Sequence, residues 1–162
     1  MYLRQARIGA RRIVIHLAFS EFNVAQKLSS LQPYILSIVR VMVGLIFSMH
    51  GMMIFHWITP PAMPAMPGPA PAHTVMGPDL HVLAGILEIA GGWLFLIGLW
   101  TAPVAFILSG EMAVAYFTAH APQSLWPIFN MGDAAVLYCF VFLLYVVTGP
   151  GKWSVDHLIS RS

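Results

Sequence analysis

The stretch from Leu80 to Trp100 reads LHVLAGILEIAGGWLFLIGLW and decides the fold. It is apolar and long enough to cross a bilayer, because a spanning helix needs roughly 20 residues. One acid, Glu88, lies near its middle, where a charge costs on the order of 2.5–3.5 kcal/mol on insertion scales. Gly85, Glu88 and Gly92 share one helical stripe, and glycines allow a second helix to approach closely. We therefore expect Glu88 to face protein and not lipid.

The composition of the whole chain is typical of an integral membrane protein. Of its 162 residues, 59% are hydrophobic and 9% are charged, whereas a soluble domain carries about 25% charged residues. Five of the eight Lys and Arg residues precede residue 28, a bias that indicates membrane orientation or contact with anionic headgroups and not nucleic-acid binding. The single cysteine, Cys139, leaves no disulfide framework and no Cys-x-x-Cys redox pair within the chain.

Four apolar segments predict an all-α fold, a bundle of four transmembrane helices that run up-down-up-down, with a basic extension before the first. The first segment carries small and polar residues at helical spacing, which predicts a face that packs against another helix. That face consists of Ser37, Arg40, Gly44, Ser48 and Gly51. A similar ridge in the third segment, Ala105, Ser109 and Ala113, leaves room for a dimer. We expect the spans at residues 33–57, 80–100, 102–120 and 130–148, with Thr101 capping the third.

This reading divides the chain into three parts. Residues 1–32 form a basic tail or an interfacial helix, residues 33–149 the transmembrane domain, and residues 150–162 a short tail. The loops at 58–79 and 121–129 carry no Lys or Arg. The positive-inside rule therefore predicts a multi-pass protein of a bacterial or archaeal cytoplasmic membrane, with both termini in the cytoplasm.

Each span carries one formal charge. At a rise of ~1.5 Å per residue, Arg40 lies about 10 Å from the inner end, Glu111 about 14 Å, Glu88 about 18 Å and Asp133 about 22 Å, with His50 at about 26 Å. Arg40 is within reach of either glutamate, so at least one acid lacks a full partner. Intramembrane ionisable residues indicate a functional site by default. The alternatives are a structural ion pair and, for Asp133, an acid in the first turn of a helix.

The sequence gives little indication of a metal or haem site. His56, Met63, Met66, His73 and Met76 are side chains that suit Cu(I), but their spacing matches no compact site, and we predict none. His50 and His120 as axial haem ligands would rest on rough depth alone. The sequence shows no haem, flavin or metal signature.

Four motifs together resemble the DoxX family of small four-helix membrane proteins. The resemblance covers about residues 35–157, although the basic residue that often follows the family's first His-Gly is replaced here by Met52-Met53-Ile54. The motifs are Arg40-Val-Met-Val-Gly44 with His50-Gly51; Gly85-Ile-Leu-Glu88-Ile-Ala-Gly91-Gly92, continuing to Gly98-Leu-Trp-Thr101-Ala-Pro103; Asn130-Met-Gly132-Asp133-Ala134; and Gly149-Pro-Gly151-Lys152-Trp-Ser154-Val-Asp156.

The resemblance implies a membrane subunit of a quinone-linked respiratory or redox complex, of the thiosulfate:quinone oxidoreductase or oxidative-stress type, with quinone or quinol as cofactor. A quinone site needs an apolar cleft with a few polar groups. We predict Glu88, Arg40 and Asp133 as catalytic residues. We predict His50, Glu111 and Asn130 as cofactor-binding residues, with partner subunits or further copies of the chain beside them. A non-catalytic accessory or assembly subunit, or a small transporter that uses the intramembrane carboxylates, remains an alternative.

Overall fold

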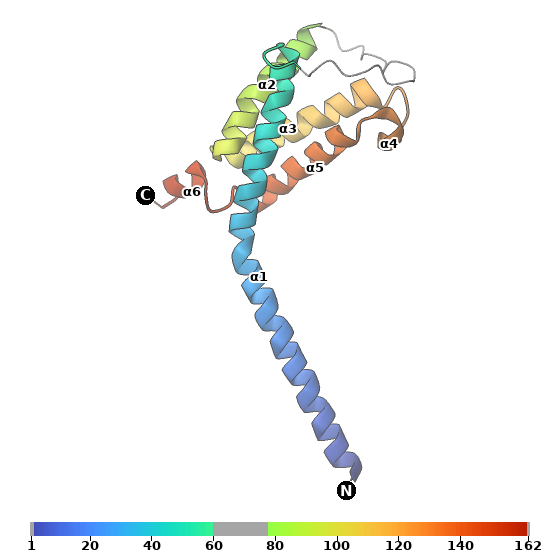
Figure 1. Ribbon diagram of the computed structural model, residues 1–162, viewed down its shortest axis with the longest axis vertical. Helices are drawn as coiled ribbons and strands as arrows, with labels where there is room; N and C mark the ends of the chain where they lie inside the picture. The colour runs from blue at the N-terminus through green and yellow to red at the C-terminus, as the bar shows by residue number, and fades with distance from the viewer. Residues whose placement is uncertain (1, 60–77, 162) are drawn as a thin grey trace.

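The computed structural model describes the backbone of residues 2–59 and 78–161, and the side chains of residues 26–59 and 79–161. Within these ranges every regular element is a helix (Figure 1). A π-helical turn, Tyr116–His120, extends the third long helix. The α-helices are α1 (Tyr2–Ile54), α2 (Pro78–Ile97), α3 (Thr101–Ala115), α4 (Pro127–Asn130), α5 (Asp133–Thr148) and α6 (Val155–Ile159).

The predicted four-helix membrane bundle is confirmed. Three described segments are long and apolar enough to cross a membrane, namely Gln26–Ile54, Asp79–Ile97 and Thr101–His120, and Asp133–Thr148 is a shorter apolar helix. Successive long helices alternate in direction, as Figure 1 shows. The 16 residues of α5 cover about 24 Å.

Helices α1 and α2 pack along the two stripes that the sequence indicates. Ser37, Arg40 and Ser48 are all buried. A Cβ atom added to Gly44 would lie 2.8 Å from the backbone oxygen of Gly92, so the two helices are in backbone contact there. The prediction that these stripes form a packing face is confirmed.

An aromatic core joins α1, α2 and α5. The Phe142 ring lies edge-on to Phe47 and Phe95, with centroids 4.8 Å and 5.0 Å away, and Phe95 contacts Tyr145 in the same way at 4.9 Å. Edge-to-face geometry at this spacing is the favourable arrangement for aromatic rings. The core therefore holds three of the four long helices together.

Helix α3 packs against α5 through small residues. The Ser109 hydroxyl donates a hydrogen bond to the Cys139 carbonyl at 2.9 Å, and Ala105 beside it is fully buried. This ridge packs against α5 of the same chain, so a dimer, which stays a prediction, would use another face.

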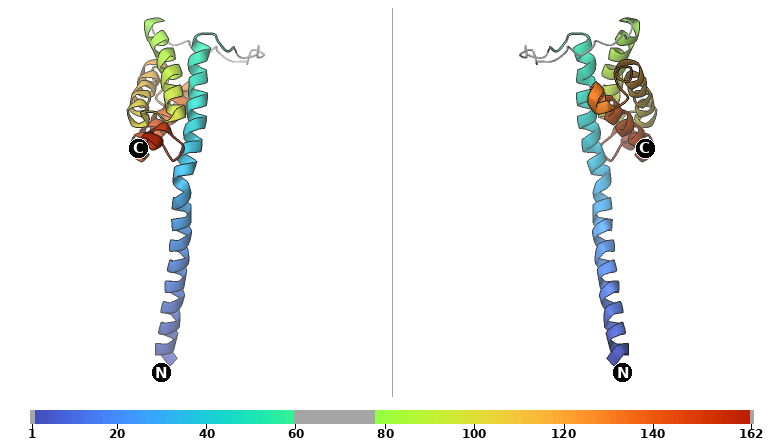
Figure 2. Two further views of the ribbon diagram at one scale, coloured as in Figure 1. Left: turned by 90° about the vertical axis from the view of Figure 1, so that its left-hand side faces the viewer. Right: turned by 90° about the vertical axis from the view of Figure 1, so that its right-hand side faces the viewer.

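Helix α1 extends far beyond the bundle (Figure 2). Its 53 residues run for about 80 Å and pass through Pro33 without a break. The expected division at residue 33 therefore does not coincide with a helix end. The role of residues 1–32 as an interfacial helix or a tail stays a prediction.

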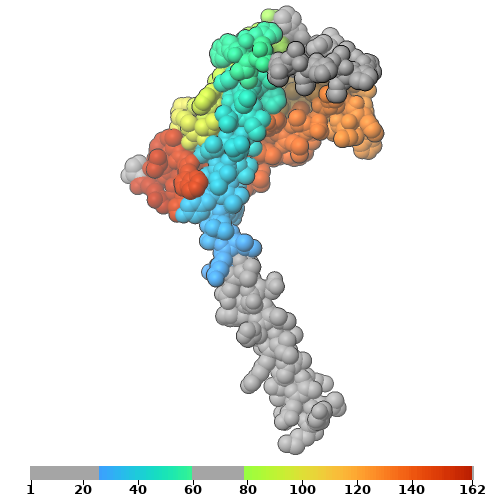
Figure 3. All heavy atoms as spheres, in the orientation of Figure 1, coloured from blue at the N-terminus to red at the C-terminus, as the bar shows by residue number. Residues whose placement is uncertain are grey.

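The C-terminal segment folds back onto α1, where Figure 3 shows it seated. We call residues 151–156 the C-terminal clasp. The Lys152 N–H donates to the Pro33 carbonyl at 3.0 Å, and the Trp153 N–H donates to the Ser37 hydroxyl at 2.9 Å. The Asp156 N–H donates to the Gly98 carbonyl at 2.9 Å. The clasp therefore ties α1 to the turn between α2 and α3.

The start of α3 differs from the expectation. Thr101 is the first helical residue, and Trp100, at a φ of 51°, occupies the N-cap position without a side-chain cap. The Asp156 carboxylate accepts the N–H groups of Trp100 and Thr101 instead. The prediction of Thr101 as the cap is wrong, because a distant acid satisfies these donors.

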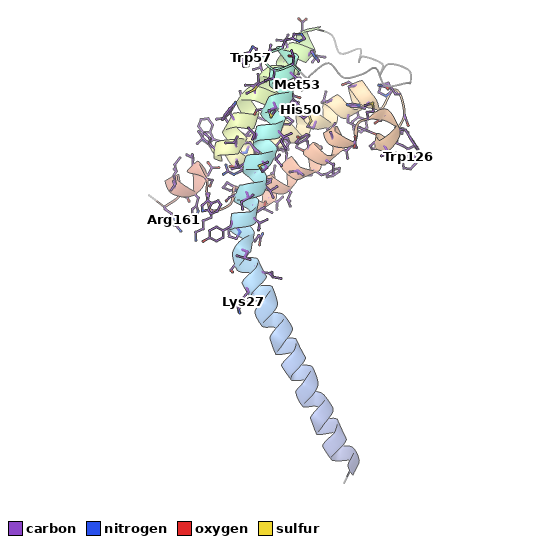
Figure 4. The ribbon with its side chains drawn as sticks, in the orientation of Figure 1. Lys27, His50, Met53, Trp57, Trp126 and Arg161 are labelled. Carbon is purple, nitrogen blue, oxygen red and sulfur yellow. The ribbon has the colours of Figure 1, made fainter. Side chains whose placement is uncertain are left out.

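Two exposed tryptophans lie at the end of the bundle opposite two exposed basic residues (Figure 4). Figure 4 shows Trp57 and Trp126 toward the end of the bundle that lies away from Lys27 and Arg161. All four side chains are exposed. Tryptophan is enriched where a helix leaves the hydrocarbon layer. This pattern agrees with a transmembrane bundle, while the side on which the termini lie stays a prediction.

Candidate functional site

Glu88 lies between two cavities inside the bundle. A cavity of about 420 Å³ opens between α2 and α3, and a second of about 280 Å³ lies among α1, α3 and α5. We call them the α2–α3 cavity and the α1–α5 cavity. Four residues line both, namely Glu88, Met112, Ala115 and His120. The two spaces therefore share a wall in which Glu88 and His120 are the polar members.

The α2–α3 cavity is an apolar cleft with carboxyl groups in it. Its walls include Leu83, Leu87 and Ile107 from the two helices. Glu88 contributes from α2 and Glu111 from α3. Two acids that the sequence places on different helices therefore line one cavity.

The α1–α5 cavity has an aromatic wall. Phe47 and His50 line it from α1, and Tyr138 lines it from α5. The His50 and Tyr138 rings meet edge-on with centroids 5.9 Å apart. His50 is therefore placed at the cavity by its neighbour on α5 as well as by its own helix.

The two glutamates present unused acceptor atoms. Glu88 is 8% exposed, and its Oε2 atom is buried without a hydrogen-bond partner among the described residues. Both carboxylate oxygens of Glu111 are likewise buried without a partner in that part of the chain. Buried polar atoms are normally hydrogen-bonded, so these unpaired oxygens are exceptions of the kind that occur at functional sites.

Both histidines use the same ring nitrogen to bind backbone. His120 Nδ1 lies 3.0 Å from the Asn130 carbonyl oxygen, and His50 Nδ1 lies 3.1 Å from the Ile46 carbonyl oxygen. A carbonyl oxygen can only accept, so Nδ1 carries the proton in each ring. Nε2 is then the nitrogen left for a ligand, and in the neutral ring it is an acceptor.

Arg40 is engaged elsewhere. Its Nη1 donates to the Phe95 carbonyl at 2.9 Å, and its Nη2 donates to the Trp153 carbonyl. It lines neither cavity. The alternative of an ion pair between Arg40 and Glu88 or Glu111 is not found in the described part of the chain, because the guanidinium bridges the end of α2 and the C-terminal clasp.

Gly98 makes this position of Arg40 possible. It adopts a φ of +72° after the last turn of α2, and the space that a Cβ would fill is occupied by the guanidinium of Arg40. Positive φ favours glycine, which has no Cβ to clash. The Gly98-Leu-Trp-Thr101 motif is therefore part of the seat of Arg40.

Asn130 and Asp133 line neither cavity, although their neighbours Met131 and Ala134 line the α1–α5 cavity. Asn130 is 2% exposed. Its amide donates to the Ser124 carbonyl at 2.5 Å, and its Oδ1 accepts the Gly132 N–H at 2.8 Å. These bonds hold the turn before α5. Asp133 is exposed in the first turn of α5, where an acid interacts favourably with the helix dipole.

The copper hypothesis is largely outside the described structure. Met63, Met66, His73 and Met76 lie outside the described residues. Within residues 26–59 and 79–161, no group of three or more His, Cys, Asp or Glu side chains is arranged to hold a metal ion.

Comparison with known sequences identifies the family. The sequence model of the DoxX family matches residues 35–121, more than half of the chain. The chain belongs to the DoxX family. An uncharacterized protein of Haemophilus influenzae is 36% identical over 133 residues, which cover 80% of this chain and 94% of that protein. An uncharacterized membrane protein of Mycobacterium tuberculosis is 28% identical over 138 residues, covering 76% and 80%. No solved structure matches.

The DoxX match contains most of the cavity residues. His50, Glu88, Glu111 and His120 fall inside it, and Tyr138 falls outside. Of the six predicted site residues, the structure brings Glu88, Glu111 and His50 to the cavities, and it places Arg40, Asn130 and Asp133 elsewhere.

Sequence reasoning missed His120 and Tyr138 as cavity residues. His120 ends a span, a position that is typical of an interfacial residue. It ends a π-helical turn with i→i+5 hydrogen bonds, in which side chains do not follow α-helical spacing; such turns are frequent at functional sites. Tyr138 carries no signal in a single sequence, because an aromatic residue in a span is ordinarily a packing residue.

Proposed function

We propose that this DoxX protein is the membrane subunit of a quinone-linked respiratory or redox complex and that the two cavities bind the quinone. The observation that carries the proposal is the position of Glu88 in the wall shared by both cavities, where its buried oxygen has no partner among the described residues. A thiosulfate:quinone oxidoreductase or an oxidative-stress complex is the class of assembly that the family suggests.

The shape and lining of the cavities suit a quinone ring. Small-molecule sites commonly occupy roughly 300–1,000 Å³ and combine apolar walls with a few placed polar groups. The volumes of about 420 and 280 Å³ are of this order. Apolar side chains such as Leu87 and Met112 supply the walls, while Glu88, His50 and His120 supply the polar groups.

In this reaction the present chain exchanges the protons and a partner protein exchanges the electrons. Reduction of a quinone takes two electrons and two protons. Glu88 is the residue that exchanges protons with the ring oxygens, since a carboxyl group within hydrogen-bond reach can serve as a general acid or base. His50 or His120 holds a ring oxygen, and Glu111 supplies a second carboxyl in the α2–α3 cavity. In this proposal the electrons come from, or go to, a partner protein.

Arg40, Asn130 and Asp133 take other roles in this proposal. Arg40 fixes the C-terminal clasp, Asn130 fixes the turn before α5, and Asp133 lies at a helix start. With both termini in the cytoplasm of a bacterium or archaeon, Arg40 lies near the cytoplasmic face. Glu88 and His50 at the cavities then lie farther from the cytoplasm than Arg40.

The test is quinone reduction by the purified native complex with Glu88→Gln. The substitution keeps the size of the side chain and removes the exchangeable carboxyl proton, so we expect the rate to fall by at least about tenfold. Asp133→Asn is the matched control, because it also neutralises an acid but lies in neither cavity wall, and it should leave the rate unchanged. Full activity of Glu88→Gln would refute the assignment of Glu88.

Identification of the chains that co-purify with this protein tests the other half of the proposal. A partner with a redox centre supports a quinone-linked complex. A partner without one, together with no quinone binding, favours an accessory or assembly subunit. Proton or ion flux in proteoliposomes that Glu88→Gln abolishes would favour a transporter.

A further inference from the structure

We infer that the cavities bind the reduced, dihydroxy form of the quinone more tightly than the oxidised, dicarbonyl form. This inference rests on the proposed function and adds the redox state that the site prefers. It follows from the hydrogen bonds of three side chains at the cavities, each of which already donates its proton to a backbone carbonyl.

The first two side chains are the histidines. The Nδ1–H groups of His50 and His120 donate to the carbonyls of Ile46 and Asn130, at 3.1 Å and 3.0 Å. The tautomer of each neutral ring is thereby fixed, and Nε2 keeps a lone pair and no proton. Each histidine therefore offers a ligand an acceptor.

Thr118 is the third. Its hydroxyl donates to the Val114 carbonyl at 2.7 Å, four residues earlier in the helix, and the residue lines the α2–α3 cavity. A hydroxyl has one proton to give, so the remaining valence of this oxygen can only accept. The α2–α3 cavity is therefore lined by Thr118 and His120, and the α1–α5 cavity by His50 and His120. Each of these three side chains can only accept a hydrogen bond from a ligand.

The other polar side chains of the described cavity walls do not discriminate between a hydroquinone and a quinone. The carboxyl groups of Glu88 and Glu111 accept when ionised and donate when neutral, and the Tyr138 hydroxyl does both. His81, at the start of α2, makes no hydrogen bond with the described residues that fixes its tautomer. Arginine and lysine, which only donate, are absent from the described lining residues. The fixed groups therefore set the preference.

A hydroquinone and a quinone meet these acceptors differently. The hydroxyl groups of a hydroquinone donate to Nε2 or to Thr118 Oγ1. The carbonyl oxygens of a quinone have no proton, so their lone pairs face the lone pairs of these acceptors and no hydrogen bond forms. Sites built to bind a ligand hydroxyl reject analogues without it by large factors, and we expect at least a tenfold preference for the hydroquinone, with the factor set by how fully the ring fills the cavity.

This preference would change the chemistry of the bound ring. Benzoquinone, two electrons from the partner and two protons give hydroquinone. Tighter binding of the product makes the bound quinone a better oxidant than the free one, by about 30 mV for each tenfold in affinity of a two-electron couple. The site is thus suited to receive electrons from a partner.

The test measures equilibrium binding under anaerobic conditions to the full chain in nanodiscs. The probes are a short-chain benzoquinone, its hydroquinone and the dimethyl ether of that hydroquinone, which keeps the ring and lacks both donors. We expect the hydroquinone to bind at least about tenfold more tightly than the other two. Equal binding, or tighter binding of the quinone, would overturn this inference and leave the proposed function standing. Absence of binding by all three would overturn both.

Histidine variants test whether the fixed tautomers cause the preference for the hydroquinone. His50→Gln and His120→Gln replace a fixed acceptor by an amide that can also donate, so the preference should shrink while the quinone still binds. His56→Asn is the control, since His56 is exposed, lines neither cavity and has a φ of 56° that asparagine tolerates.

Thr118→Val is the second variant. It keeps the shape of an exposed side chain, so the fold does not depend on it, and it removes the third acceptor. A reduced preference in this variant supports the inference. An undiminished preference in Thr118→Val and in both histidine variants would overturn it.

Discussion

The carboxylate of Asp156 accepts the backbone N–H of Thr101 at 2.8 Å, although the two residues lie 55 positions apart. It also accepts the Trp100 N–H at 2.7 Å. The first N–H groups of a helix have no partner within the helix. The C-terminal clasp therefore caps α3, and the end of the chain stabilises the turn between the second and third spans.

The first prediction concerns this cap. Asp156→Ala should lower the free energy of unfolding by about 0.5–2 kcal/mol, the usual cost of losing a capping oxygen. The free energy of unfolding of Asp156→Asn should lie between those of Asp156→Ala and wild type, because asparagine keeps one acceptor oxygen and loses the charge. Thermal unfolding in detergent measures both. Ser160→Ala, which loses only a bond from its hydroxyl to the His157 carbonyl on the exposed helix end, is the control. Equal stability of Asp156→Ala and wild type would show that water replaces the cap.

The second prediction concerns pH. Burial raises the pKa of Asp156, but the hydrogen bonds from the backbone of Thr101 and Trp100, with the charge of Arg40, outweigh it and hold the pKa below the ordinary 3.8. A lowered pKa in the folded state contributes stability above the unfolded pKa, and this contribution is lost as the pH falls through the folded pKa.

The stability difference between wild type and Asp156→Asn should therefore be full above about pH 5 and shrink as the pH falls below the ordinary value. Unfolding of both proteins measured across this range checks it. Because every other acid is common to the two proteins, their difference isolates Asp156. A difference that is constant down to about pH 3 would contradict the assignment.

The third prediction concerns Arg40. Its fork binds two carbonyls, and it is 1% exposed. A lysine ammonium is a single point charge and cannot span the two acceptors in the same way. Arg40→Lys should thus cost about 1–3 kcal/mol of stability, since one buried carbonyl loses its partner.

Quinone binding separates this role from a catalytic one. Arg40 lines neither cavity, so Arg40→Lys should keep the binding constant of wild type for the fraction that is folded. Normal unfolding stability with lost quinone turnover would instead place the guanidinium in the reaction.

The fold could be predicted from the sequence because its signals are local. Apolar length predicts each span, and small residues at helical spacing predict the face of α1 that packs on α2. The partner of Arg40 could not be predicted, because it is the backbone of Phe95 and Trp153. Carbonyl groups exist at every position, so a sequence gives no sign of which one a guanidinium will meet.

The residues of the candidate site were also only partly predictable from the sequence. Glu88 stands out because a charge in an apolar span is costly, and the structure places it between the cavities. Asn130 and Asp133 stand out equally by residue type, but their contacts are those of a turn and a helix start. His120 reaches the cavities through a π-helical turn that residue spacing alone does not reveal.

The last prediction compares two glycines. A Cβ on Gly51 would lie 2.7 Å from the Gly85 carbonyl oxygen and 2.9 Å from Cβ of Glu88, whereas a Cβ on Gly110 meets nothing within 4 Å. Gly51→Ala should therefore destabilise the protein by about 1–3 kcal/mol, as overpacking does. Gly110→Ala, also inside a helix, should be neutral or stabilise by up to about 1 kcal/mol. Because Gly51 touches α2 at Glu88, the first variant should also weaken quinone binding, and the second should not. Equal behaviour of the two variants in unfolding and in binding would show that α1 and α2 do not need backbone contact to place Glu88.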